Sequence, residues 1–204
     1  MRFIRFIGVT LISAVFAGCA AQQPNFQQVE TPPKAIVQNG YSFVPLDDPQ
    51  WYIIGRTPFK VALSKKGSAT DETYVINGEL FRFPEFASDE AFLQAIKQGQ
   101  STDLDPANPT RYKRLVHDAE LRKHRGETCV FSHVVTEDHG AKKRTSTAGF
   151  MILDVYALVC RHPQNQNAAI TVGYSQRNYP ENRDGNIESK ARQLIESVDF
   201  TTLR

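Results

Sequence analysis

The sequence predicts an α+β fold built on a mainly antiparallel, twisted sheet of about six to seven strands with two helices. The most continuously apolar run outside the N-terminus, Gly149–Arg161, is interrupted only by Asp154, which is typical of a central strand buried on most of both faces. Gly126–Glu137 before it and Ala168–Arg177 after it complete an antiparallel meander. Outside the meander, two segments have the apolar period of amphipathic helices.

The N-terminal segment has the pattern of a bacterial export signal. Arg2 and Arg5 precede an apolar run, Phe6–Ala17, that is too short to span a bilayer as a mature helix. The tetrapeptide Phe16-Ala17-Gly18-Cys19 resembles the lipobox of bacterial lipoproteins, in which the cysteine becomes the lipidated first residue. An ordinary signal peptide with a cysteine at its cleavage site is the alternative.

This N-terminus predicts the domain organisation and the location of the protein. Residues 1–18 are expected to be a signal peptide, residues 19–38 a lipidated Cys19 with a flexible tether, and residues 39–204 a single periplasmic α+β domain. The tether is rich in Gln and Pro and would reach roughly 20–25 Å as a flexible coil. Ala20 after the cysteine is similar to the pattern of lipoproteins sorted to the outer membrane, facing the periplasm.

Four strands are expected before the first helix. Asp47-Asp48-Pro49 forms a turn between the first two, and the chain's only Trp begins the second. The expected strands are Tyr41–Leu46, Trp51–Arg56, Phe59–Ser64 and Thr73–Phe83.

The first helix is expected over Ser88–Gln98. Ser88 is a suitable N-cap, and Asp89 and Glu90 in the first turn complement the helix dipole. Gly99 would then be the C-terminal cap.

The segment between this helix and the meander is polar. Ser101–Thr110 is expected to be a solvated loop, because Asp103 and Asp105 lack the glycine and terminal glutamate of an EF-hand calcium loop. Arg111–His124 follows as a charged strand or hairpin.

The second helix is expected over Asn186–Val198. Its apolar side chains recur with a period of 3.6 and form one face, which consists of Ile187, Ala191, Leu194, Ile195 and Val198.

Three stretches, GYSFVPLDDPQWYII, RKHRGETCVFSHVV and IESKARQLIESVDF, carry a resemblance to a known family. With the order of elements, they make residues 40–200 resemble the PsbP/DcrB-like α/β/α sandwich. The resemblance implies this sandwich fold and a protein that binds rather than catalyses, since that family is largely non-enzymatic. It carries over no catalytic residues.

Cys129 and Cys160 are expected to form a disulfide. Export would bring the domain into an oxidising compartment, and lipidation of Cys19 leaves an even pair. The two residues lie at the outer ends of neighbouring strands, where a disulfide can join opposed positions. The resulting register opposes Phe131 to Leu158, His133 to Tyr156, and Val135 to Asp154.

One side of the meander offers an enzymatic hypothesis. If the next hairpin keeps the same parity, Ser175 falls near Asp154, and Ser175, His133 and Asp154 form a hydrolytic group beside Tyr156. Two observations oppose it: Gly173–Arg177 lacks the second glycine of a nucleophile elbow, and a flat strand offers no evident oxyanion hole. A hydrogen-bonded polar patch is the alternative.

The other side of the meander is expected to form the core beneath both helices. Its members are Val130, Val134, Met151, Leu153, Val155, Val159, Ile170, Val172 and Tyr174.

Charge and histidine spacing argue against two classes of ligand. Without Arg2 and Arg5 the chain has 22 basic and 22 acidic residues, which argues against nucleic acid as the main partner. The five histidines are scattered, with no ligand spacing on one element, so no metal site and no cofactor are expected.

The leading hypothesis is therefore a non-enzymatic envelope lipoprotein, a binding or accessory module that contacts another envelope component. The alternatives are a hydrolase that uses Ser175 and His133, and a carrier of a small ligand or a metal. The loop Glu137–Ala148 contains Lys142, Lys143 and Arg144, which could attract an acidic partner or anionic headgroups. A solvated loop that touches nothing is the alternative for this segment.

Overall fold

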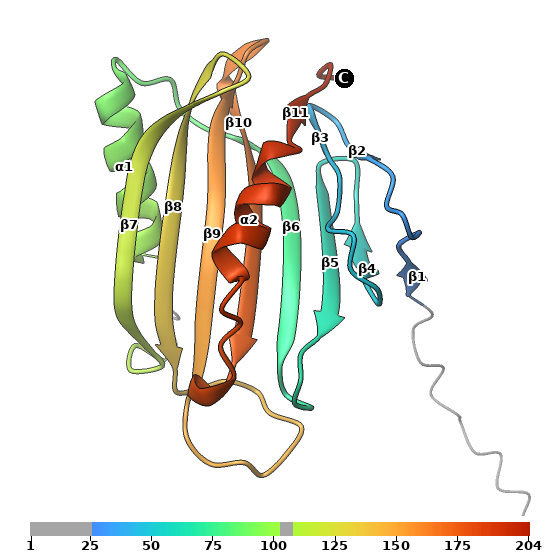
Figure 1. Ribbon diagram of the computed structural model, residues 1–204. Helices are drawn as coiled ribbons and strands as arrows, with labels where there is room; N and C mark the ends of the chain where they lie inside the picture. Colours follow the sequence, from blue (N-terminus) through green and yellow to red (C-terminus); the bar gives the residue numbers. More distant parts are fainter. Residues whose placement is uncertain (1–25, 103–107) are drawn as a thin grey trace, which may run out of the picture.

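The computed structural model describes residues 26–102 and 108–204, and an eight-stranded antiparallel sheet dominates it (Figure 1). The strand order is β1-β4-β5-β6-β10-β9-β8-β7, and a small sheet has the order β11-β3-β2. The elements are β1 Gln27–Gln28, β2 Ile36–Val37, β3 Tyr41–Phe43, β4 Tyr52–Arg56, β5 Lys60–Lys66, β6 Thr73–Arg82, α1 Asp89–Thr102, β7 Tyr112–His124, β8 Glu127–Asp138, β9 Met151–His162, β10 Asn165–Asn178, the 3-10 turn Pro180–Asn182, α2 Ile187–Glu196 and β11 Asp199–Phe200. The predicted α+β class with two helices is confirmed, with more strands than expected.

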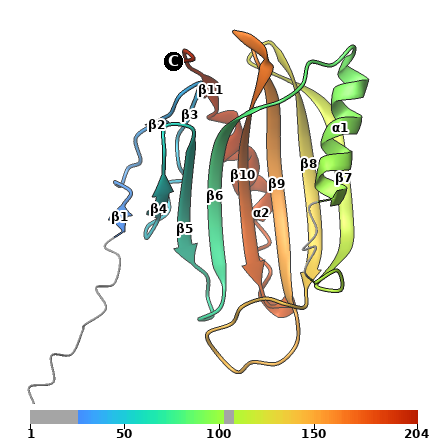
Figure 2. The ribbon, with the colours of Figure 1, turned by 180° about the vertical axis from the view of Figure 1, so that it is seen from behind.

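The two helices lie on opposite faces of the large sheet. Helix α2 and the small sheet cover one face (Figure 1), while α1 lies on the other face, over β7 and β8 (Figure 2). The expectation that both helices cover the same face is wrong. The central strands are apolar on both faces, and each face needs its own cover to exclude water.

The core on the α2 side is the larger one. It holds the only Trp, Trp51, beside Tyr174, with the two rings 6.3 Å apart. The apolar face of α2 predicted from the sequence, from Ile187 to Val198, is buried here. Ile170, Val172 and Tyr174 also belong to this side, not to the opposite face where the sequence analysis placed them.

The core on the α1 side forms around Phe92, which is fully buried. Ser88 Oγ accepts the backbone N–H of Ala91 at 3.1 Å, so Ser88 caps the helix as expected. The helix continues through Gly99 to Thr102, and Gly99 is therefore not its C-terminal cap.

Residues 26–38 pack on the domain, contrary to their expected role as a tether. Gln27 pairs with Ile53 in the β1–β4 ladder, and Ile36 is buried in the larger core. The Gln38 amide donates to the carbonyl of Thr57 at 2.6 Å. The ordered domain thus includes Phe26, thirteen residues before the expected start, because the few apolar side chains of this Gln-rich segment find partners on β3 and β4.

The register of the central hairpin is the one predicted. Cys129 faces Cys160 and His133 faces Tyr156 across β8 and β9, and the sequence separation of the cysteines is 31 residues. The charged segment that follows α1 is a single edge strand, β7, paired along its length with β8. Within residues 26–102 and 108–204, no helix is long and apolar enough to cross a membrane.

Candidate functional site

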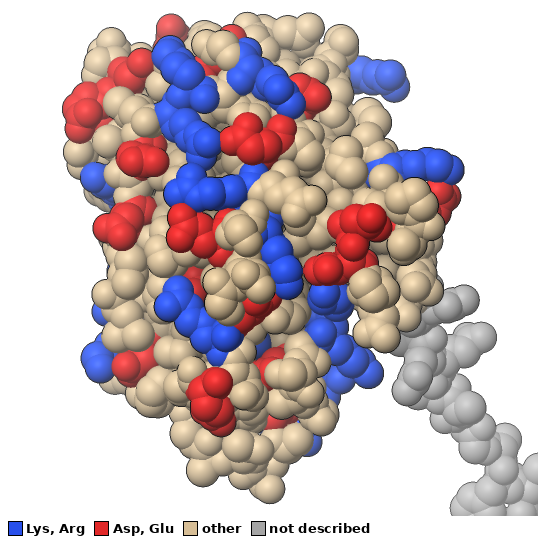
Figure 3. All heavy atoms as spheres, in the orientation of Figure 1, with Lys and Arg blue, Asp and Glu red and all other residues tan. Residues whose placement is uncertain are grey.

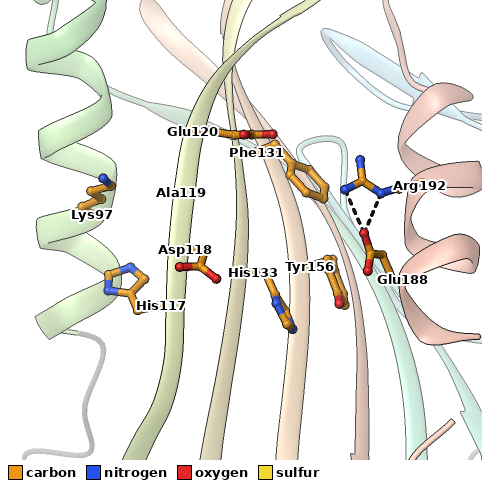
Figure 4. Close-up of a pocket in the computed structure, with 10 residues that line it drawn as sticks. All are labelled: Lys97, His117, Asp118, Ala119, Glu120, Phe131, His133, Tyr156, Glu188 and Arg192. Atoms are coloured by element: carbon orange, nitrogen blue, oxygen red, sulfur yellow. Dashed lines mark hydrogen bonds and ion pairs between the residues drawn. The ribbon is translucent and has the colours of Figure 1, made fainter. Parts of the chain in front are cut away.

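A groove opens on the α2 side of the sheet, between α2 and the edge strand β7 (Figure 4). Its volume is about 390 Å³. The residues that line it are Lys97, His117, Asp118, Ala119, Glu120, Phe131, His133, Tyr156, Glu188 and Arg192. We call this the β7–α2 groove.

The floor of the β7–α2 groove is aromatic. The His133 and Tyr156 rings are parallel, with centroids 4.0 Å apart and planes at 5°, because the two residues are directly opposed across β8 and β9. Phe131 lies 6.1 Å from Tyr156, and the guanidinium groups of Arg122 and Arg192 lie over its ring at 5.5 and 4.9 Å. These contacts pack the aromatic rings against one another and against the two guanidinium groups.

A buried carboxylate lies beside this floor, on the same face of the sheet. Asp154 is completely buried, and its Oδ1 lies 2.9 Å from Nε2 of His133. Its Oδ2 accepts Nε and Nη2 of Arg183 at 2.9 and 2.7 Å. Burial, followed by the charges of Asp154 and Glu188, raises the pKa of Tyr156 to about 12, so its phenol is neutral at ordinary pH.

Ser175 does not join His133 and Asp154, and the predicted hydrolytic group is wrong. Ser175 faces Val155 across β10 and β9, while Gln176 faces Asp154. The register shifts between Asn165 and Ala169, where β10 contains three more residues than β9. An odd shift reverses the parity of the strand and turns Ser175 to the α1 side. His133 and Asp154 remain paired without that hydroxyl.

The rim of the groove along β7 is acidic. Asp118 and Glu120 are exposed and face His133 and Phe131 across the β7–β8 ladder. In the described part of the chain, neither carboxylate has an ion-pair partner. On the opposite rim, Arg192 is paired with Glu188 at 2.8 Å (Figure 4).

The groove extends around the edge of β7 to the α1 side. His117 lies there beside Lys97, and its Nε2 is 3.1 Å from Oε1 of Gln100. Burial, with the nearby charges of Arg114 and Lys97, lowers the pKa of His117, so this imidazole is neutral at pH 7.

Sequence reasoning identified part of the groove and missed the rest. His133, Asp154 and Tyr156 were expected to share one face, and they do. The sequence predicted only a charged strand or hairpin for the segment that contains β7. The acidic rim was missed because the alternation of its side chains between the two faces of a strand was not considered. A signal was present, since Asp118, Glu120 and Arg122 recur every second residue.

Charged residues are distributed over the whole α2 side rather than gathered into one field (Figure 3). Several of the basic groups there are paired, among them Arg122 with Glu196 and Arg125 with Asp199. The unpaired carboxylates of the β7–α2 groove are therefore a local feature of a charge-balanced surface.

The structure joins Cys129 and Cys160 in a disulfide with a Cα–Cα distance of 4.2 Å. Both residues are completely buried in the larger core, at the end of the hairpin that carries His133 and Tyr156. Cys19 and the calcium-like pair Asp103 and Asp105 lie outside the described residues. Across residues 26–102 and 108–204, no three His, Cys, Asp or Glu side chains are grouped to hold a metal ion.

The loop that carries Lys142, Lys143 and Arg144 is held against the domain. Lys143 donates to the carbonyls of Thr147 and Gly149 at 2.8 and 2.6 Å. Its ammonium group therefore stabilises the loop itself. The side chains of Lys142 and Arg144 are exposed and have no hydrogen bond or ion pair in the described regions. Two of the three predicted contact residues therefore remain accessible to a partner.

Asp71 anchors this loop. It accepts the hydroxyls of Thr145 and Tyr179 and the backbone N–H groups of Arg144 and Thr145. These hydrogen bonds, first those of Thr145 and Tyr179, lower the pKa of Asp71 to about 2.

Acid is expected to release the loop only near pH 2. A carboxylate with a depressed native pKa stabilises the fold fully above its unfolded-state pKa, and this contribution is lost as the pH falls through the native value. The NMR amide resonances of Arg144 and Thr145 should therefore titrate together with a midpoint of about 2. Asp71→Asn should abolish that titration, and a midpoint at the ordinary value of 3.8 would contradict the anchor.

Comparison with known proteins shows the fold. No protein-family model matches the chain, and neither does any curated protein. Among solved structures, the chain is similar to the solution structure of cyanobacterial PsbP (CyanoP) from Synechocystis sp. PCC 6803. The similarity has a TM-score of 0.50 at 14% sequence identity and covers 82% of this chain and 92% of that one. The chain thus has a PsbP-like fold.

Proposed function

We propose that the protein is a non-enzymatic lipoprotein of the bacterial envelope, anchored through Cys19, whose periplasmic domain binds another envelope protein in the β7–α2 groove. The observation that carries this proposal is the acidic rim, Asp118 and Glu120, which lies unpaired beside the packed aromatic floor. Anchoring in the outer membrane, facing the periplasm, is part of the proposal.

The groove favours binding over hydrolysis. Its lining contains no serine, threonine or cysteine, and Ser175 points to the other side of the sheet. Both carboxylate oxygens of Asp154 are engaged, one by His133 and one by Arg183, which suits a structural ion pair. A hydrolase would need a nucleophile beside His133 and donors for an oxyanion. A carrier of small ligands is the remaining alternative, and a bound ligand in native mass spectrometry would favour it.

The chemistry of the groove indicates the kind of partner. Two unpaired carboxylates attract a lysine or arginine side chain, while the partly exposed ring of His133, stacked on the buried Tyr156, can contact its apolar portion. A protein segment that carries such a side chain supplies both. This partner differs from the acidic one that Lys142 and Arg144 would attract. Reversing the charges of one surface at a time therefore shows which of the two surfaces binds the partner.

Reversing the acidic rim should weaken the complex. With Asp118→Lys and Glu120→Lys together, crosslinking to the partner in intact envelopes should fall at least about tenfold, because like charges would then face each other. Thermal stability should stay nearly unchanged, since both side chains are exposed. Crosslinked products, separated by mass, provide the measurement.

The matched control reverses the loop, with Lys142, Lys143 and Arg144 changed to Glu. Crosslinking should persist in this variant if the groove is the contact. Loss in the loop variant with no loss in the groove variant would reject the groove and assign the contact to the loop. Persistence in both would reject both surfaces.

Lipidation of Cys19 is a separate prediction. Cells given labelled palmitate should label the parent protein but not Cys19→Ser, because only the cysteine of the FAGC sequence can accept the lipid. The variant should also leave the membrane fraction. Label in the variant, or membrane association equal to the parent's, would contradict the anchor.

A further inference from the structure

The connection between the proposed anchor and the domain is short. Because residues 26–38 pack on the domain, only seven residue steps separate Cys19 from Phe26. Seven residues span at most about 25 Å when fully extended. The eight-stranded sheet has seven spacings between β1 and β7, which amount to about 34 Å. The β1 edge therefore lies within about 25 Å of the surface of a bilayer that holds Cys19, whereas the connection sets no such limit for the β7 edge.

The β1 edge exposes apolar side chains. Exposed fractions are 44% for Phe26, 37% for Tyr52 and 43% for Ile54. In the β1–β4 register Gln28 faces Tyr52 and Gln27 faces Ile53, Phe26 directly precedes β1, and Ile54 lies at the irregularity between Ile53 and Gly55. The three side chains therefore lie on these two paired strands or directly beside them. We call them, with β1 and β4, the β1–β4 edge.

A basic group lies at the end of the same strand, on the other face of the sheet from Tyr52. Arg56, at the end of β4, is exposed and donates to Gln38 Oε1 and to the carbonyl of Val37, both at 3.0 Å. Within the described ranges it has no carboxylate partner. Exposed aromatic and aliphatic side chains suit the boundary between headgroups and acyl chains, and a cation at the same edge of the sheet can attract anionic headgroups.

From the short connection and this composition, we infer that the β1–β4 edge rests against the surface of the membrane that holds Cys19. The inference depends on the proposed lipid anchor and adds the orientation of the domain to it. The β7–α2 groove, at the opposite edge of the sheet, then faces away from the bilayer and is open to a partner in the periplasm.

Photocrosslinking to lipid tests this orientation. The photoreactive residue p-benzoylphenylalanine replaces Tyr52 or Ile54 in the full, lipid-anchored chain, reconstituted in vesicles of phosphatidylethanolamine and phosphatidylglycerol. Leu115 and Leu121 are matched controls, since they are exposed apolar residues on β7, at 47% and 39%. Lipid adducts at positions 52 and 54 should exceed those at 115 and 121 by at least about fivefold, because the inferred orientation holds the β1–β4 edge at the bilayer and the β7 edge away from it.

Two outcomes would overturn the inference. Equal adducts at the two edges would show that the domain has no fixed orientation. With a further probe in place of Arg144, adducts at that position without any at 52 or 54 would place the loop against the bilayer. Palmitate labelling of the same preparation separates the two proposals. An unlabelled protein rejects the anchor and the orientation with it, whereas a labelled protein with equal adducts rejects only the orientation.

Discussion

Replacing Cys129 and Cys160 together by alanine should lower the free energy of unfolding by about 3–4 kcal/mol. The disulfide closes a loop of 31 residues, and in the chain-entropy model a loop of that length stabilises the fold by this amount through its effect on the unfolded state. Both positions are buried in the larger core, so the lost sulfur contacts act in the same direction. Urea unfolding of the parent and the variant, compared at their midpoints, measures the difference.

The reduced parent protein is the control for this double substitution. A reductant should shift the midpoint of the parent towards that of the variant and leave the variant unchanged. The parent should also show no free thiol at Cys129 or Cys160 when it is alkylated unfolded without reductant. Two alkylated thiols, or a loss of stability below about 1 kcal/mol, would contradict a structural disulfide.

Phe92→Ala should destabilise the domain by about 3–5 kcal/mol. Phe92 is completely buried and is the centre of the α1-side core, with its ring 5.9 Å from that of Phe83 and 5.8 Å from that of Phe86. The Arg161 guanidinium lies over the same ring at 5.2 Å. Truncation removes these contacts and leaves a cavity that a rigid sheet cannot fill, so α1 loses its main attachment to the sheet.

Leu121→Ala provides the comparison for Phe92→Ala. Leu121 is exposed on β7, and its truncation should change stability by less than about 0.5 kcal/mol. Hydrogen exchange adds a local measurement, in which the α1 amides of the Phe92 variant should lose protection more than those of β9. An effect of Phe92→Ala as small as that of Leu121→Ala would mean that α1 is not held by this core.

The proposals for the groove and for the membrane edge describe one arrangement. The short connection would hold the β1–β4 edge at the bilayer, and the acidic rim on β7 would lie across the width of the sheet from it. A partner that binds there would approach from the periplasm without competing with lipid. Each proposal has its own experiment, and either can fail alone.

The sequence alone was sufficient for the central hairpin. A pair of cysteines at strand ends, together with side chains that alternate between faces, defines the pairing of β8 with β9, and the structure has the predicted register. It was also sufficient for the class, for the Ser88 cap and for the apolar face of α2, because these depend on residues close together in the chain.

Three features were decided only by the tertiary structure. The three extra residues in β10 between Asn165 and Ala169 have no distinctive composition, yet they turn Ser175 away from His133 and remove the hydrolytic group. Residues 26–38 have a weak apolar pattern and become ordered only because β3 and β4 offer them a surface. Helix α1 covers the opposite face from α2, since strands that are apolar on both faces give no local sign of which helix covers which. In each case the deciding contacts join segments far apart in the sequence, and the free energy of such contacts cannot be read from local pattern.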